Sequence, residues 1–272
     1  MTRALGFDSG VGGLSVLDAL AAAQLDLEID YAADNAWLPY GEKSDAELKV
    51  RCPALIAALA RQLSPDVVVL ACNTASTIAL AEVRAAVAQP VVGVVPPIKP
   101  AAELSRSRVI GLLATPGTVR RAYTDELIRN FAADAHVIRC GASALVRVAE
   151  DALAGNEPDE KVIREAIAPL FSAPRGDEID VVALACTHFP LIAEALARTA
   201  PRPVRWLDSG AAIARRVKQV SGCAAGAARM RHAALSEASG WAKLGAAFAA
   251  RGFSSYRAIE PAPLFTLHAH AA

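Results

Sequence analysis

The sequence has no long uninterrupted apolar run and no excess of charge of either sign. Its 272 residues include 28 Lys and Arg against 28 Asp and Glu, which gives a formal net charge of zero. Without a basic field, a nucleic-acid partner is not expected. Without an apolar stretch of about 20 residues, no membrane span is expected either. The first residues also lack the apolar segment of a secretory signal, so we expect a cytoplasmic protein.

Cysteine patterns typical of metal centres are absent as well. The five cysteines form no C-x-x-C pair and belong to no His/Cys cluster with metal-ligand spacing, so no metal ion is expected. In a reducing cytoplasm, disulfides are not expected. The glycine-rich turn at 8–13 also lacks the G-x-G-x-x-G spacing and the Lys-Ser/Thr of a P-loop, which argues against a nucleotide cofactor.

What the sequence does contain is an alternation of short apolar strands and helical patterns. We predict strands at 4–7, 29–32, 67–71, 91–95, 109–113, 136–139 and 181–185. We predict helices at 14–23, 45–62, 77–87, 120–132, 144–154, 159–171 and 191–200. This alternation is typical of an α/β fold with parallel sheets flanked by helices.

Three prolines, Pro96, Pro97 and Pro100, form a natural hinge between two halves that show the same pattern. We therefore predict two similar α/β domains. The first domain comprises residues 1–96 together with residues 208–272, a helix-rich stretch that returns to it. The second domain comprises residues 97–207.

Two cysteines stand in near-copies of one local sequence. Cys72 ends the run VVVLAC at 67–72, and Cys186 ends the run VVALAC at 181–186. A buried parallel strand that ends in a thiol places that thiol at the carboxyl edge of a sheet, where ligands bind in open α/β folds. A single such cysteine is commonly a small buried hydrophobe. The matched pair favours a functional site with a proton carrier on each side.

A glycine-rich turn, Asp8-Ser9-Gly10-Val11-Gly12-Gly13, follows the first predicted strand. Its backbone N–H groups can approach an anion at a helix start, and a carboxylate suits it as well as a phosphate. Alternatively, Asp8 or Ser9 only caps the helix that begins near Leu14. The spacing does not decide between these two roles.

Polar residues follow both cysteines, Asn73 and Thr74 after the first, Thr187 and His188 after the second. A helix N-terminus or a nearby histidine lowers a thiol pKa from its ordinary ~8.5 into a range of roughly 3.5–7.5. We therefore expect both thiols to be more acidic than a free cysteine. His188 is close enough in sequence to share a proton network with the second thiol, or it caps the next helix.

These residues and several others resemble the signature segments of bacterial glutamate racemases. The segments are Phe7–Leu14, Pro39–Gly41, Ala71–Ala75, Val92–Pro96, Ala114–Thr118, Cys186–Pro190 and Asp208–Gly210. The resemblance extends from Gly6 to about Val217. Ala185 replaces a glycine that is usual before the second cysteine, and Pro97 and Lys99 mark one branch of the family. Neither departure touches the expected acid and base groups.

The resemblance implies a cofactor-independent racemase with its active site in a cleft between two pseudo-twofold related domains. Two thiols would exchange the α-proton of glutamate on opposite faces, Cys72 for the D-enantiomer and Cys186 for the L-enantiomer. Asp8 would assist the first thiol and His188 the second. Glu150 aligns with a further catalytic carboxylate of the family.

The resemblance also implies how the substrate, L- or D-glutamate, would be held. The expected substrate-binding residues are Asp8, Ser9, Pro39, Tyr40, Gly41, Asn73, Thr74, Thr115, Thr118 and Thr187. Backbone and hydroxyl donors on the two carboxylates would fix the α-carbon between the sulfurs. The family further implies D-glutamate production for peptidoglycan synthesis and a homodimer.

Two other enzymatic hypotheses stay open at this point. A racemase for aspartate or another acid would share the two-cysteine chemistry. A cysteine nucleophile enzyme would use Cys186 with His188, and it would leave Cys72 without a role. Some members of the family are associated with inhibition of DNA gyrase, a role for which the neutral net charge provides no support.

Overall fold

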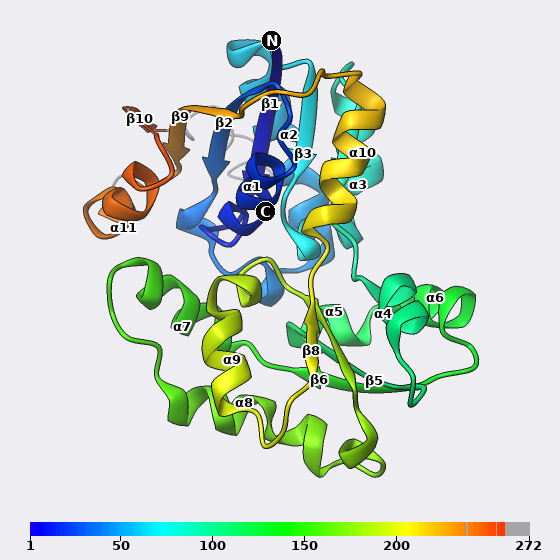
Figure 1. Ribbon diagram of the computed structural model, residues 1–272. Coiled ribbons are helices and arrows are strands. Elements are labelled where there is room, and N and C mark those ends of the chain that lie inside the picture. The colour runs from blue at the N-terminus through cyan, green and yellow to red at the C-terminus, as the bar shows by residue number, and fades with distance from the viewer. Residues whose placement is uncertain (238, 254, 259–272) are drawn as a thin grey trace, which may run out of the picture. The chain divides into compact units, whose positions relative to one another are not determined.

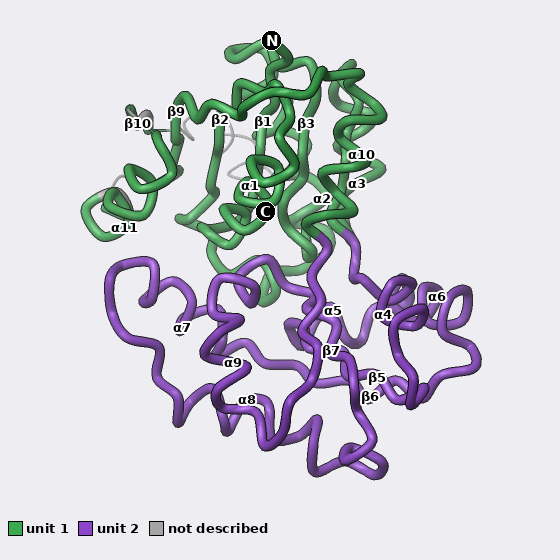
Figure 2. The backbone as a smooth tube through the Cα atoms, in the orientation of Figure 1, with its two compact units in different colours: residues 1–94, 210–272 green, residues 95–209 purple. Residues whose placement is uncertain are grey.

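The computed structural model describes residues 1–237, 239–253 and 255–258 (Figure 1). The chain forms two compact units, unit 1 with residues 1–94 and 210–272 and unit 2 with residues 95–209 (Figure 2). Residues 259–272, which the predicted first domain includes, lie outside the described residues.

In the described part of unit 1, six strands form one sheet of parallel pairs in the order β10-β9-β2-β1-β3-β4. The strands are β1 (Thr2–Asp8), β2 (Leu27–Ala33), β3 (Val67–Leu70), β4 (Val91–Gly93), β9 (Arg229–Leu235) and β10 (Ser255–Ala258). The α-helices are α1 (Leu14–Ala22), α2 (Asp45–Leu63), α3 (Asn73–Ala86), α10 (Gly210–Ser221) and α11 (Ser239–Ala249). Two short 3-10 helices, η1 (Asn35–Trp37) and η2 (Tyr40–Glu42), follow β2.

Helices cover both faces of this sheet, as the strand residues require. Leu5 and Phe7 of β1 join a buried cluster with apolar residues of α2 and α3. Gly6, between them, faces the other way, and a Cβ placed there would lie 3.0 Å from Leu17 of α1. Successive strand residues point to opposite faces, so an apolar run such as Val67–Leu70 is buried on both.

In residues 95–209, all of them described, four strands form a second parallel sheet in the order β6-β5-β7-β8. The strands are β5 (Val109–Ala114), β6 (His136–Gly141), β7 (Val181–Ala185) and β8 (Arg205–Leu207). The α-helices are α4 (Ile98–Leu104), α5 (Pro116–Arg120), α6 (Ala122–Phe131), α7 (Ala144–Leu153), α8 (Glu160–Ser172) and α9 (Ala193–Thr199). The 3-10 helices are η3 (Gly176–Glu178) and η4 (Phe189–Ile192).

Four strands of unit 1, in the order β2-β1-β3-β4, correspond to the four strands β6-β5-β7-β8 of unit 2. The residue pairing between the central strands also matches. Phe7 pairs with Leu70 across β1 and β3, and Leu113 pairs with Leu184 across β5 and β7. Each cysteine stands two residues beyond the second partner of its pair. The duplicated sequence therefore corresponds to one backbone arrangement that occurs once in each unit.

The predicted α/β class with parallel sheets flanked by helices is confirmed. All seven predicted strands are present, but α3 begins four residues earlier than predicted, at Asn73. The predicted helix at 120–132 is in fact α5 followed by α6, and the predicted helix at 191–200 is η4 followed by α9.

The structure adds detail to two further expectations. The helix-rich stretch from Asp208 also contains β9 and β10, which extend the sheet of unit 1 beyond β2. The predicted hinge at Pro96, Pro97 and Pro100 is partly helical, because α4 begins at Ile98. Pro100 lies in the first turn of that helix, where a missing backbone N–H costs no hydrogen bond. No helix in the described part of the chain is long and apolar enough to cross a bilayer.

Candidate active site

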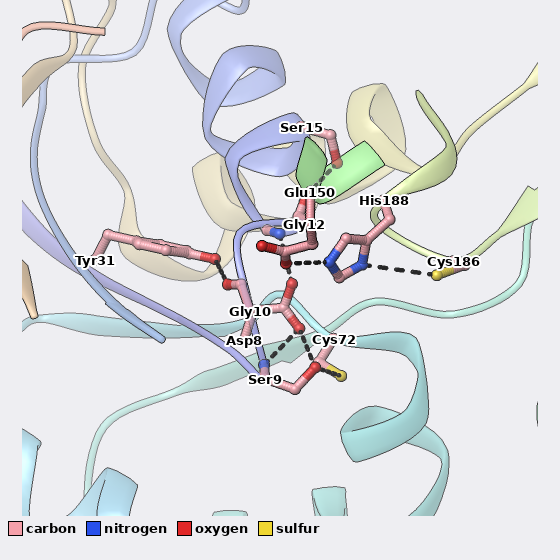
Figure 3. A network of polar contacts seen from close by, with 11 residues as sticks. Asp8, Ser9, Gly10, Gly12, Ser15, Tyr31, Cys72, Glu150, Cys186 and His188 are labelled. Atoms are coloured by element: carbon pink, nitrogen blue, oxygen red, sulfur yellow. Dashed lines mark hydrogen bonds and ion pairs between the residues drawn. The ribbon is translucent and has the colours of Figure 1, made fainter. Parts of the chain in front are cut away.

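The first group of polar residues lies at the carboxyl ends of β1 and β3 in unit 1. These strands are neighbours, and the N–H of Ala71 donates to the carbonyl of Phe7 at 2.7 Å. The residues that come next, Asp8 and Cys72, are therefore brought close together. Ser9 bridges them, because its hydroxyl lies 3.3 Å from Asp8 Oδ1 and 3.8 Å from the sulfur of Cys72 (Figure 3).

Asp8 is fully buried and is held by backbone donors of the glycine-rich turn. The N–H of Ser9 donates to Oδ1 at 2.6 Å, and the N–H of Gly13 donates to Oδ2 at 2.5 Å. Gly13 is the N-cap residue of α1, whose start no side chain caps. Asp8 therefore orders the turn before α1 without capping that helix, and it lies beside Cys72.

Cys72 is the N-cap residue of α3, and the N–H of Ala75 donates to its sulfur at 3.5 Å. Burial and the charge of Asp8 raise the pKa of this thiol well above its ordinary value, although Ala75 and Ser9 act in the opposite direction. The expectation of an acidic first thiol is therefore wrong. Desolvation and a neighbouring carboxylate outweigh the helix terminus, so Cys72 keeps its proton at neutral pH.

Asn73 and Thr74 form the first residues of α3 and are both buried. The side-chain oxygen of Asn73 has no hydrogen-bond partner among the described residues. A buried, unpaired acceptor is costly unless a ligand satisfies it. This oxygen is therefore available to an N–H donor of a bound molecule.

The segment Pro39-Tyr40-Gly41 belongs to the same unit, and η2 packs against α3. Tyr40 is buried, and its hydroxyl donates to Asp34 at 2.6 Å. Burial, together with the charge and the hydrogen bond of Asp34, raises the pKa of Tyr40 well above its ordinary value. Tyr40 therefore remains a neutral hydrogen-bond donor over the physiological pH range.

Sequence reasoning missed the partner of Tyr40 and the residue that neutralises it. Asp34 directly follows β2 and is fully buried, and Arg51 of α2 is nearly so. Arg51 donates to both oxygens of Asp34, at 2.5 and 2.7 Å. Asp34 was identifiable as a polar residue at the end of an apolar strand, the same signal that singled out Asp8. Arg51 lies within a helix of ordinary polarity and gave no comparable signal.

The second group lies in unit 2, where Cys186 directly follows β7. Nδ1 of His188 lies 3.9 Å from the sulfur of Cys186, and its Nε2 lies 2.8 Å from Oε1 of Glu150 (Figure 3). Glu150 comes from α7, 38 residues earlier in the chain. The structure thus joins a thiol, an imidazole and a carboxylate into one chain of contacts.

His188 is buried, yet it favours its protonated form. Burial alone lowers the pKa of His188, but its interactions with Cys186 and with Glu150 raise it by more, so the pKa lies well above the ordinary value. At neutral pH the imidazole therefore carries a positive charge. As a cation it donates from both ring nitrogens, one to each of its two partners.

Three threonines predicted to hold the substrate also belong to unit 2 and are buried. Thr115 follows β5, the strand next to β7, and caps α5 by accepting the N–H of Thr118 at 3.4 Å. The hydroxyls of Thr115 and Thr118 lie 3.0 Å apart. Thr187 stands between Cys186 and His188. Unit 2 therefore carries hydroxyl groups together with Cys186, as unit 1 carries those of Ser9 and Thr74 together with Cys72.

The two groups share one chemical capability. Each presents a thiol at a sheet edge with an ionisable neighbour, which suits proton transfer to or from a bound molecule. Among the described residues, no three His, Cys, Asp or Glu side chains gather so that they could hold a metal ion.

Comparisons with known proteins agree with this chemistry. The model of the family described as "Asp/Glu/Hydantoin racemase" matches residues 8–217. That range includes every residue of both groups. The glutamate racemase of Sphingopyxis alaskensis is 51% identical over 215 residues, which cover 79% of this chain and 80% of that protein. The glutamate racemase of a Shewanella species is 49% identical over 212 residues, which cover 78% of this chain and 76% of that protein.

A solved structure is also similar over nearly the whole chain. The crystal structure of Escherichia coli glutamate racemase, in complex with L-glutamate and the activator UDP-MurNAc-ala, superimposes with a TM-score of 0.87. It is 39% identical, and the match covers 95% of this chain and 98% of the other.

Proposed function

We propose that this chain, which belongs to the Asp/Glu/Hydantoin racemase family, interconverts L- and D-glutamate without a cofactor. Curated relatives at about half identity are glutamate racemases, which favours glutamate over aspartate as substrate. One observation carries the mechanism: two thiols occupy the same register position in two units of the same strand order. A cysteine nucleophile enzyme would need only the thiol beside His188.

Racemisation removes the α-proton from one face of the carbon and returns a proton to the other face. One residue cannot easily serve both faces, so two acid/base groups are needed. In the L-to-D direction, the Cys186 thiolate takes the α-proton and the Cys72 thiol donates its own. The reverse direction exchanges these roles.

The charged neighbours of the two sulfurs fit these roles. Burial and Asp8 keep the proton on Cys72, which is the form that acts as an acid on an incoming L-enantiomer. The His188 cation, held by Glu150, balances negative charge on the sulfur of Cys186.

We propose that Asp8, Ser9, Pro39, Tyr40, Gly41, Asn73, Thr74, Thr115, Thr118 and Thr187 hold the substrate. The unpaired oxygen of Asn73 suits the α-ammonium group, and backbone and hydroxyl donors suit the two carboxylates. The α-proton is weakly acidic, so donors placed before the reaction must stabilise the carbanionic transition state.

The wider biological context is part of the same proposal. The chain acts in the cytoplasm as a homodimer and supplies D-glutamate for peptidoglycan. Its first domain comprises residues 1–96 and 208–272, and its second domain residues 97–207.

The decisive experiment is incubation of L-glutamate with the purified protein in deuterated water, with no added cofactor. We expect D-glutamate with deuterium at the α-carbon. Mass spectrometry measures the deuterium, and the loss of optical rotation measures racemisation. Aspartate, treated in the same way, should react far more slowly. Failure to form deuterated D-glutamate would sink the assignment.

A further inference from the structure

Arg51 lies outside both groups of expected site residues, yet it is one of the most buried charged side chains in the described part of the chain. Only 6% of its surface is exposed, and Asp34 beside it is fully buried. Nε of Arg51 donates to Asp34 Oδ2 at 2.5 Å, and Nη2 donates to Oδ1 at 2.7 Å. The guanidinium also stacks on Trp37, with its Cζ 4.2 Å from the ring centroid.

This ion pair ties together three separate segments of unit 1. Asp34 lies at the end of β2, Arg51 lies on α2, and the Tyr40 hydroxyl of η2 donates to the same Oδ2 that accepts from Arg51. Through its backbone, Asp34 also donates its N–H to the carbonyl of Asp8 at 2.9 Å. The pair therefore connects the turn of Asp8 with the segment that carries Tyr40.

A stabilising role does not by itself explain a charge pair at this depth. Removing two charges from water costs about as much as their attraction returns, and apolar side chains of similar volume often replace such pairs without loss of stability. What a bidentate pair provides instead is fixed geometry. Here the geometry it fixes is the position of Tyr40 and its two chain neighbours.

We propose that Arg51 is a positioning residue for substrate binding, which acts through Asp34 on the segment Pro39-Tyr40-Gly41. The inference rests on the proposed function, in which this segment holds a carboxylate of the substrate. We assign Arg51 to binding and not to proton transfer, because Asp34, which accepts both of its hydrogen bonds, also accepts from Tyr40, whose proton stays in place.

The test compares Arg51→Met, Arg51→Lys and Tyr40→Phe with the wild type in steady-state racemisation from both enantiomers. Arg51→Met should raise KM by about tenfold or more for both, the equivalent of one lost charged hydrogen bond, and change kcat by less than about threefold. Arg51→Lys keeps the positive charge but cannot donate two parallel hydrogen bonds as the guanidinium does. Its KM should therefore lie between those of the wild type and Arg51→Met. Arg61→Met, on an exposed turn of the same helix, is the matched control and should keep the wild-type KM.

Tyr40→Phe removes only the hydroxyl that donates to Asp34, and its ring keeps the packing. It should raise KM like the Arg51 variants, and Arg51→Lys decides the case if Arg51→Met does not fold. A folded Arg51→Met or Tyr40→Phe with KM within twofold of the wild type overturns the inference, as does a loss confined to kcat. Absence of racemisation by the wild type would instead refute the proposed function.

Discussion

Cys72 and Cys186 stand at equivalent places on two copies of one backbone arrangement, but the charges beside them have opposite signs. In unit 1, Phe7 pairs with Leu70, and the next residue is Asp8, which carries a carboxylate. In unit 2 the equivalent position is Ala114, which carries no charge. The backbone around both positions is the same, since Asp34 donates its N–H to Asp8 and Ala142 donates its N–H to Ala114.

The cation of unit 2 is likewise missing from unit 1. His188 stands two residues after its cysteine, and the same place in unit 1 is taken by Thr74. The duplication thus preserves the strand ends and the thiols and changes their electrostatics. A carboxylate beside a buried thiol favours the protonated thiol, whereas a cation beside a thiol favours the thiolate. Two thiols at equivalent places are thereby given unlike electrostatic surroundings.

Removing either sulfur should have the largest effect. Cys72→Ser and Cys186→Ser should each lower kcat by about 10²–10⁴-fold, because each removes one acid/base group. Optical rotation from both enantiomers measures this loss. In deuterated water, Cys72→Ser should still exchange the α-proton of L-glutamate and not that of D-glutamate.

Cys140→Ser is the matched control for these variants. Its sulfur donates to the carbonyl of Ala166 at 3.3 Å in unit 2, a bond that a hydroxyl can also make. Its kcat should stay at the wild-type level. A Cys72→Ser variant with full turnover would contradict the two-thiol comparison and favour the nucleophile mechanism.

Asp8→Asn tests whether the carboxylate sets the state of the first thiol. Burial still raises the pKa of Cys72 in this variant, but the charge of Asp8, which also raises it, is gone, so the pKa should fall. We expect a loss in kcat of about 10²-fold or more, since an acid/base group then works with a misplaced pKa. Carbon-13 NMR of labelled cysteine, assigned by comparison with Cys72→Ser, measures the titration. An unchanged titration would show that burial alone controls this thiol.

Gly13→Ala should disturb only the turn of unit 1. A Cβ at this position would lie 2.8 Å from the hydroxyl of Tyr31 and 3.0 Å from Cβ of Asp8, although the backbone of Gly13 is in an ordinary helical conformation. Such overpacking costs about 1–3 kcal/mol of unfolding free energy. Urea unfolding measures it. Wild-type stability together with wild-type activity would mean that the turn tolerates the methyl group and does not hold Asp8 tightly.

The effect of Glu150→Gln should depend on pH. Burial lowers the pKa of His188, but Cys186 and Glu150 raise it by more, so the pair with Glu150 stabilises the fold only while His188 is protonated. Its contribution, about 1.5–3 kcal/mol for a charged hydrogen bond, is fully present below about pH 6.5 and is lost as the pH rises through the raised pKa. Urea unfolding of both proteins from pH 6 to 10 should show a gap that closes in the alkaline range. A gap independent of pH would refute a protonated His188.

The strands that the sequence did not predict are those with little apolar signal. β9 begins with Arg229-Met230-Arg231-His232, and β8 has only three residues. Such strands depend on pairing with a neighbour, and the pattern of their own side chains does not reveal it. The buried strands were predictable, because a run such as Val67–Leu70 can only lie inside a sheet covered on both faces.

The candidate site divides in the same way. Asp8, Cys72 and Cys186 were recognisable because each follows an apolar strand directly. The contact of Glu150 with His188 and that of Arg51 with Asp34 were not, since the partners lie 38 and 17 residues apart and come from different elements. Local patterns do not specify which helix face meets which strand end.

By itself, the sequence determined the alternation of strands and helices, the duplicated strand-end thiols and the family to which the chain belongs. Short-range periodicity and residue identity are sufficient for these, because both are properties of neighbouring residues. Only the tertiary structure decided the protonation of Cys72 and His188. A pKa depends on burial and on charges that the fold brings close, and in this protein those charges make two equivalent thiols unlike each other.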